Sequence, residues 1–140
     1  MSVVYTGGTF DIPHAGHIQF LRKCKNYGSW LVVALNTDEF IMRFKNKRPI
    51  MSFPERYEVI RSIEYVDEVI PNLSGEDSKP TIMSVNPDHI VIGDDWISKD
   101  YYKQMGFTKE WLKEQGIELH YVPYTKNISS TEIRRRANEY

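Results

Sequence analysis

The chain has 140 residues, of which 41% are hydrophobic and 26% are charged, and its formal net charge is −1 at pH 7. This length suits one domain with a sizeable core, so we expect residues 1–140 to form a single domain. The near-zero net charge gives no reason to expect nucleic-acid binding. We expect no membrane span and no secretion signal. The single cysteine, Cys24, cannot form an internal disulfide, which favours a cytoplasmic setting.

The first predicted elements are a strand, a glycine-containing turn and a helix. Residues 2–6 are β-branched or aromatic, which favours a buried strand, and the apolar positions of residues 18–25 suit a helix packed on a sheet. The turn between them contains His14 and His17. Glycines let the backbone approach a ligand closely, and free N–H groups at a helix start favour anions. The turn therefore predicts a phosphate site, although a tight turn with two surface histidines is the alternative.

The rest of the chain alternates strands with helices. Apolar runs predict further strands at residues 30–35, 67–71, 89–92 and 118–122. Helices are predicted at residues 39–42, 52–63, 80–85 and 98–115, the last with a candidate break at Gly106, and after residues 129–132, which have capping-box spacing. Residues 43–49 are predicted to form a basic loop. The alternation predicts an α/β fold with a mainly parallel five-stranded sheet flanked by helices.

Four candidate motifs follow predicted strands, at residues 8–17, 36–38, 93–96 and 123–131. In open parallel sheets, ligands bind beyond the carboxyl ends of the strands, at a switch point in the strand order. We therefore expect the four motifs to lie at one edge of the sheet and to form one site.

The string Gly-Thr-Phe-Asp-x-x-His-x-Gly-His at residues 8–17 resembles the first signature of the cytidylyltransferase family of the nucleotidyltransferase superfamily. Residues 128–133 look like its second signature, and residues 36–40, 65–71 and 93–96 extend the match over essentially the whole chain. The similarity is closest to the branch that uses glycerol 3-phosphate. It implies a Rossmann-like nucleotidyltransferase fold and transfer of a cytidylyl group from CTP to a phosphorylated alcohol, with pyrophosphate as the second product.

The resemblance also implies a cofactor, an assembly state and residue roles. Mg²⁺ is expected, held mainly through the triphosphate, and so is a homodimer. The expected catalytic residues are His14, His17, Lys45 and Lys47. The same two histidines would bind the nucleotide together with Gly8, Thr9, Phe10, Asp94, Thr125, Ser129, Ser130 and Thr131. The expected acceptor-binding residues are Asp11, Asp38, Arg56 and Trp96.

Several of these residues have a structural role as the alternative to a functional one. Asp11 suits bracing the turn more than reacting, and Arg56 equally suits a salt bridge on a helix surface. Residues 129–131 also suit ordinary helix capping. Asp94 also suits the cap of a turn, and Trp96 suits a position in the core. Lys45 and Lys47 each suit a solvated basic surface.

The expected reaction is in-line attack by an acceptor phosphate oxygen on the α-phosphate of CTP. A phosphomonoester is largely dianionic at neutral pH because its second pKa is about 6, so no strong general base is required. The catalyst has to position two anions and neutralise the charge on the leaving group.

Because two residues depart from the family pattern, the sequence does not identify the acceptor. Tyr124 and Glu64 stand where arginines are usual, and Lys126, Arg61 and Arg134 are candidates to replace them. Arginine binds phosphate through two parallel hydrogen bonds and lysine does not.

Three alternative functions are also open. One is an adenylyltransferase of the same superfamily that acts on a flavin or pantetheine phosphate, although residues 36–38 and 93–96 favour CTP. Another is a non-catalytic nucleotide-binding module. The third is a metal site, which the spacing disfavours, formed by His14, His17, Cys24 and His89.

Overall fold

Five parallel strands form one sheet in the order β3-β2-β1-β4-β5. The computed structural model describes residues 2–73, 77–97, 100–123 and 128–140. The strands are β1 (Val3–Gly8), β2 (Trp30–Asn36), β3 (Glu68–Asn72), β4 (His89–Gly93) and β5 (Glu118–Val122). The predicted five-stranded α/β fold is confirmed, and the sheet is parallel throughout.

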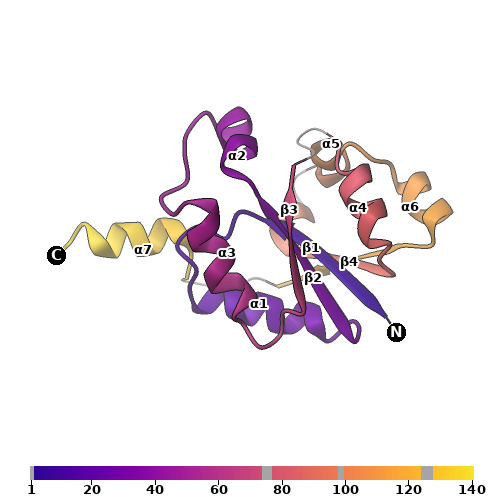
Figure 1. Ribbon diagram of the computed structural model, residues 1–140, viewed down its shortest axis with the longest axis horizontal. Coiled ribbons are helices and arrows are strands. Elements are labelled where there is room, and N and C mark those ends of the chain that lie inside the picture. The colour runs from indigo at the N-terminus through magenta and orange to yellow at the C-terminus, as the bar shows by residue number, and fades with distance from the viewer. Residues whose placement is uncertain (1, 74–76, 98–99, 124–127) are drawn as a thin grey trace.

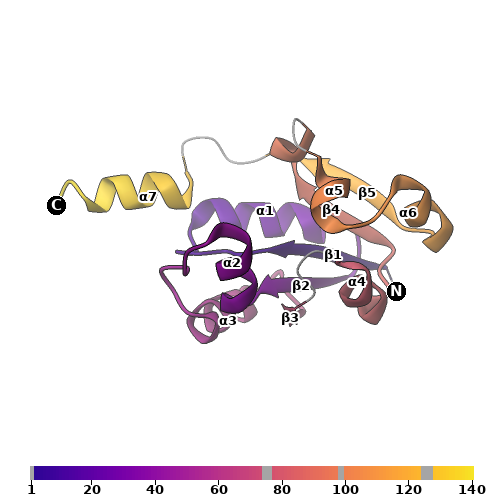
Figure 2. The ribbon, with the colours of Figure 1, turned by 90° about the horizontal axis from the view of Figure 1, so that it is seen from above.

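Helices connect the strands and flank the sheet (Figures 1 and 2). They are α1 (Ala15–Lys25), α2 (Asp38–Lys45), α3 (Phe53–Arg61), α4 (Lys79–Val85), the 3₁₀ helix η1 (Asp94–Ile97), α5 (Tyr101–Met105), α6 (Lys109–Gln115) and α7 (Ser130–Ala137). The last of these extends beyond the α/β body, and none of its residues is buried (Figure 2). Within the described residues, no helix has the length and apolar character needed to cross a bilayer.

The core lies on both faces of the sheet because successive strand residues point to opposite sides. Val4 of β1 belongs to a buried cluster with side chains of α1 and α3, and this cluster includes Cys24. The next residue, Tyr5, belongs to a second cluster with side chains of α4, α5 and α6. Burial on both faces explains the continuous apolar runs of the central strands. Cys24 is fully buried, as expected for a core residue.

Three details differ from or refine the predicted elements. The second helix is longer than predicted: α2 continues to Lys45 and is followed by Asn46 in the left-handed conformation, so Lys45 lies on a helix and not in the basic loop. The predicted break at Gly106 is confirmed, since this residue has φ +74° between α5 and α6. Ser129 caps α7 by accepting a hydrogen bond from the Glu132 N–H, whereas the Glu132 carboxylate binds arginines of its own helix.

The strand order creates a switch point between β1 and β4. From β1 the chain adds β2 and β3 on one side of the sheet, and then crosses over to add β4 and β5 on the other side. All strands are parallel, so the segments that follow them gather at one edge, beyond the carboxyl ends. This edge is where the four predicted motifs begin.

Gly28, which follows α1, has no room for a side chain. A Cβ atom there would lie 2.7 Å from the Ser2 carbonyl oxygen and 2.8 Å from Val4 Cγ2. We expect Gly28→Ala to lower the free energy of unfolding by about 1–3 kcal/mol, because the backbone must shift. The matched control is Gly7→Ala, whose Cβ would meet its nearest neighbour at 3.6 Å. Urea denaturation of both variants measures the difference, and equal stability would contradict this account.

Candidate active site

The turn after β1 places two histidines at the start of α1. His14 is the N-cap residue, and its Nδ1 accepts a hydrogen bond from the Gly16 N–H at 3.1 Å. The Nδ1 atom of His17 accepts a hydrogen bond from the His14 N–H at 3.2 Å. The two rings stack with centroids 3.9 Å apart. A Cβ at Gly16 would lie 2.9 Å from the His14 ring, so glycine at this position makes the arrangement possible. Because of this cap, α1 begins earlier than predicted, at Ala15.

Both imidazoles are neutral hydrogen-bond donors at pH 7. Each Nδ1 accepts a hydrogen bond, so the proton of the neutral ring is on Nε2. Burial lowers the pKa of His14, and burial together with the neighbouring His14 lowers the pKa of His17 to about 4. The Nε2 atom of His14 is buried and has no hydrogen-bond partner in the described part of the chain. An unpaired donor at a helix N-terminus suits an anionic oxygen.

The Asp11 carboxylate holds this turn in an uncommon conformation. Phe10 and Ile12 have φ values of 51° and 47°, which residues other than glycine rarely adopt. Asp11 accepts hydrogen bonds from the Ile12 N–H at 3.1 Å, the Ile50 N–H at 2.8 Å and the Met51 N–H at 2.9 Å. Its oxygens are therefore occupied by backbone donors. The bracing role that the sequence left open is the one that the geometry favours.

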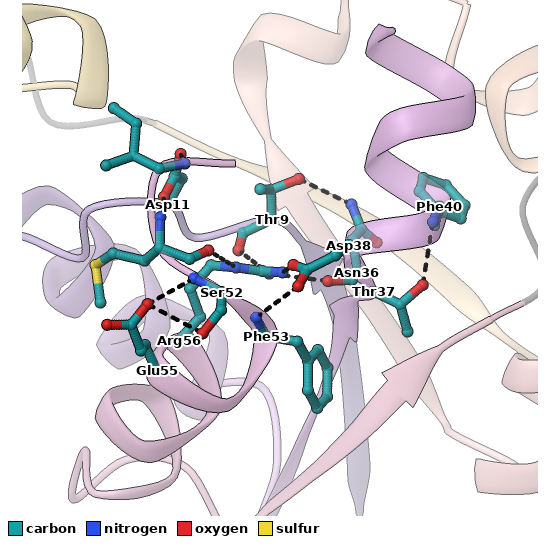
Figure 3. A network of polar contacts seen from close by, with 12 residues as sticks. Thr9, Asp11, Asn36, Thr37, Asp38, Phe40, Ser52, Phe53, Glu55 and Arg56 are labelled. Atoms are coloured by element: carbon teal, nitrogen blue, oxygen red, sulfur yellow. Dashed lines mark hydrogen bonds and ion pairs between the residues drawn. The ribbon is translucent and has the colours of Figure 1, made fainter. Parts of the chain in front are cut away.

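Arg56 joins three segments of the site from the inside (Figure 3). Its side chain is fully buried. The guanidinium donates hydrogen bonds to the carbonyl oxygens of Met51 at 3.0 Å, Thr9 at 2.9 Å and Asn36 at 2.8 Å. It also pairs with the Asp38 carboxylate at 2.7 Å. The alternative of a helix-surface salt bridge is wrong because Arg56 faces the interior. Contact of Arg56 or Asp38 with an acceptor stays a prediction.

Two neighbouring cavities open beside the turn. The cationic cavity, of about 360 Å³, is lined among others by His17, Lys45, Lys47, Arg48, Thr131 and Arg134. The amide cavity, of about 390 Å³, is lined among others by Asn36, Phe40, Phe44, Asn72, Asp95 and Gln104. Thr9, Ile41 and Lys45 line both cavities. These three residues therefore lie at the junction between the cavities.

The cationic cavity is suited to a polyanion. Its positive side chains come from α2, from residues 47 and 48 and from α7. Asp11 supplies the only carboxylate among the described residues of the lining, and backbone N–H groups already bind it. Charged donors bind phosphate oxygens strongly. The start of α7 is held here because the Ser130 hydroxyl donates a hydrogen bond to the Asp11 carbonyl oxygen.

The amide cavity offers a buried acceptor with a fixed orientation. The side-chain amide of Asn36 donates a hydrogen bond to the Thr9 hydroxyl at 3.0 Å. Asn72 in turn donates to the Asn36 side-chain oxygen at 2.9 Å. This chain of contacts leaves Asn72 Oδ1 buried without a hydrogen-bond partner in the described residues. A ligand hydroxyl or amino group would satisfy it.

The family model described as Cytidylyltransferase-like matches residues 5–136. The chain belongs to the cytidylyltransferase-like family. A glycerol-3-phosphate cytidylyltransferase from Bacillus subtilis (strain 168) is 42% identical over 134 residues, which cover 96% of this chain and 95% of that protein. An FAD synthase from Pyrococcus abyssi is 35% identical over 141 residues, covering 97% of this chain and 92% of that protein.

A solved structure has a fold similar to that of this chain. The crystal structure of a lipopolysaccharide core biosynthesis protein from Thermoplasma volcanium GSS1 has a TM-score of 0.72 and 28% sequence identity. The match covers 90% of this chain and 99% of that chain. Together with the family match, it confirms the predicted family and the nucleotidyltransferase-type fold.

The structure brings most of the predicted site residues of this cytidylyltransferase-like protein together. Those that line the cationic cavity are Thr9, Phe10, Asp11, His17, Lys45, Lys47, Ser130 and Thr131. Gly8 lines the amide cavity, and His14 stacks on His17. Ser129 is the exposed N-cap residue of α7. Asp94 is exposed in η1 and lines neither cavity, whereas its neighbour Asp95 lines the amide cavity.

Some predicted residues lie outside the described part of the chain, and some site residues were not predicted. Thr125, Tyr124 and Lys126 lie outside the described residues, as does the side chain of Trp96. Several lining residues were not placed in the site by sequence reasoning, and the polar ones include Asn72, Arg48 and Gln104. Asn72 directly follows the strand predicted at residues 67–71, at the ligand-binding edge, and this position was the available signal.

The lowered pKa of His17 predicts a pH-dependent stability. The folded-state value is about 4 and the ordinary value is 6.5, so the unfolded state takes up a proton first as the pH falls. The free energy of unfolding is therefore expected to be highest above pH 6.5 and to decrease as the pH falls from 6.5 towards 4. Urea denaturation across this range should give a shallower pH dependence for His17→Gln than for the wild type. Identical profiles would contradict the prediction.

The buried Arg56 network predicts a large stability loss. Arg56→Met leaves three carbonyl oxygens and the Asp38 carboxylate without their donor, so we expect the free energy of unfolding to fall by about 3 kcal/mol or more. The matched control is Arg61→Met on the same helix, where the exposed arginine pairs with Glu58. Its effect on stability is expected to be small, because exposed ion pairs contribute little. Similar unfolding midpoints for the two variants would count against the bracing role.

Proposed function

We propose that the protein transfers a cytidylyl group from CTP to a phosphorylated alcohol, with glycerol 3-phosphate as the expected acceptor. The products are a CDP-alcohol and pyrophosphate. Family membership and the 42% identity to a glycerol-3-phosphate cytidylyltransferase over nearly the whole chain support this reaction. The observation that carries the proposal is the pair of neutral imidazole donors beside the cationic cavity, at the switch point of the sheet.

In the proposed mechanism, the protein positions two anions and spreads the charge of the transition state. An acceptor phosphate oxygen attacks the α-phosphorus, the bond to the bridging oxygen breaks, and pyrophosphate leaves with that oxygen. His14 and His17 donate hydrogen bonds from Nε2 to the α- and β-phosphates. Ser130, through its backbone N–H, and Thr131 bind the outer phosphates at the N-terminus of α7. Fixed donors of this kind stabilise developing charge because they need no reorganisation.

Lys45 is proposed to act where the two substrates meet. It lines both the cationic cavity and the amide cavity, so its ammonium group can reach a phosphate in either. The amide cavity suits the alcohol part of the acceptor, because Asn72 Oδ1 has no partner among the described residues and can accept a hydrogen bond from a hydroxyl group. Lys47 lines only the cationic cavity of the two and is assigned to the triphosphate.

Mg²⁺ is proposed to bind mainly through the triphosphate. Asp11 of the turn and Asp38 of α2 are already bound by backbone N–H groups and, for Asp38, by Arg56. Mg²⁺ commonly binds to substrate phosphates with few protein ligands, and this donor set fits that mode. When bound, the ion neutralises charge on the leaving pyrophosphate.

We further propose a cytoplasmic homodimer. The projecting α7 has no buried residue, and the side chains of Met42 and Phe44 on α2 are 44% and 56% exposed. Met42 and Phe44 offer apolar area to a second copy of the chain, and α7 offers a charged helix that projects from the body. The single, buried Cys24 suits a reducing compartment.

Pyrophosphate release tests the proposed reaction. Purified protein with Mg²⁺ is assayed with each of the four nucleoside triphosphates and a panel of phosphorylated polyols and amino alcohols. We expect release with CTP and glycerol 3-phosphate. A preference for ATP with a flavin phosphate would instead support the activity named for the FAD synthase relative. CTP binding without pyrophosphate release for any acceptor would indicate a non-catalytic module.

Histidine variants test the mechanism. Loss of one fixed donor to transition-state charge typically lowers the rate about a hundred- to thousand-fold, so His14→Ala and His17→Ala should reduce kcat by this factor. The control Lys113→Met changes an exposed residue of α6 and should keep wild-type turnover. Circular dichroism establishes that each variant is folded. Turnover of folded histidine variants within a few-fold of wild type would remove both residues from the catalytic set.

A further inference from the structure

A second cluster of titratable side chains lies at the opposite edge of the sheet from the cationic cavity. His89 is the first residue of β4 and Glu118 is the first residue of β5, and the two are paired in the strand register. His120 follows on β5, one side-chain repeat further along the same face. Val91 and Val122 of these strands pack into the core cluster beneath α1, so the titratable side chains share the α1 face.

The three side chains converge on one point. The Nδ1 atom of His89 lies 2.9 Å from Nε2 of His120. The Glu118 carboxylate oxygen Oε2 lies 3.8 Å from the first of these nitrogens and 3.5 Å from the second. A tetrahedral zinc ion, with ligands at about 2.0–2.2 Å, holds its ligand atoms about 3.3–3.6 Å apart. One observed separation is shorter than this range, one lies within it and one is longer, so small ring rotations would place all three atoms around one ion.

The neighbouring side chains hold the two rings in place and leave one side open. The Tyr27 ring stacks on His120 with centroids 4.3 Å apart and an interplanar angle of 27°. The imidazoles of His89 and His120 are 20% and 23% exposed, whereas the Glu118 side chain is 71% exposed. The nitrogens are thus positioned by packing, and the carboxylate closes the cluster from the solvent side. Because the Glu118 side chain is largely exposed, water can reach an ion bound at this cluster.

We propose that His89, Glu118 and His120 bind one divalent transition-metal ion of the zinc class, with water at the open position. Two imidazole nitrogens and one carboxylate suit zinc, whereas Mg²⁺ prefers a shell of oxygen ligands. This ion is therefore distinct from the magnesium expected at the triphosphate. It links β4 to the edge strand β5, and it stabilises the folded chain because the unfolded chain does not hold the three ligands together.

Zinc titration of the whole chain tests this site. Chelator-treated protein, kept in Mg²⁺ and without nucleotide, is titrated with zinc alone by calorimetry, and Co²⁺ serves as a spectroscopic probe of tetrahedral coordination. We expect one zinc ion per chain and a higher Tm with zinc. The chain has four histidines, and they form two pairs. The double variant His89→Gln/His120→Gln should lose zinc binding, and the matched control His14→Gln/His17→Gln should keep it.

Glu118→Gln provides a third variant, at a residue more exposed than the two histidines. Its side chain is largely exposed, so the fold is expected to be retained while zinc binds about tenfold more weakly or worse. Unchanged affinity in Glu118→Gln would overturn the three-ligand assignment. The proposal would also be overturned if the wild type bound no zinc at micromolar concentrations, or if the His14→Gln/His17→Gln control lost binding. The short contact between His89 and His120 would then be a metal-free hydrogen bond.

Discussion

The site depends on one buried cation. The Arg56 guanidinium is shielded from solvent, and its hydrogen bonds reach Thr9 after β1, Asn36 at the end of β2 and Met51, two residues before α3. Because an unpaired buried guanidinium is costly, these segments keep their relative positions as long as the protein is folded. The Asp11 carboxylate complements this bracing by binding the backbone of residues 50 and 51. The turn that carries the histidines is therefore fixed before a ligand arrives, as electrostatic preorganisation requires.

Position and charge come from different parts of the site. The two imidazoles are held by backbone hydrogen bonds at the start of α1 and are neutral, so they contribute directed donors. The positive charge comes from Lys45, Lys47 and Arg48, which are exposed, and from Arg134 of α7. The histidine side chains are short and hydrogen-bonded to the backbone, so their positions are well defined. The lysine and arginine side chains are long and can adapt to a flexible triphosphate. Lys45 lines both cavities, so its positive charge is available at the junction between them.

Much of the fold was predictable because its signals are local. Apolar runs indicated buried parallel strands, and the glycine and histidine spacing of residues 8–17 indicated the anion-binding turn. The length of α2 was underestimated because Arg43 and Lys45 suit an exposed loop on polarity grounds, yet both are good helix formers. Asn46 was an available stop signal, since asparagine tolerates the left-handed conformation at a helix end.

The sequence by itself determined the alternation of strands and helices, the family signatures and the edge of the sheet where the predicted residues gather. Only the tertiary structure decided that Arg56 faces inward, that Asn72 meets Asn36 across 36 positions of the chain, and that His89 meets His120 across 31. Residue spacing constrains neighbours within one strand or helix. Contacts between distant segments depend instead on strand order, register and the direction in which each buried side chain can satisfy its hydrogen bonds.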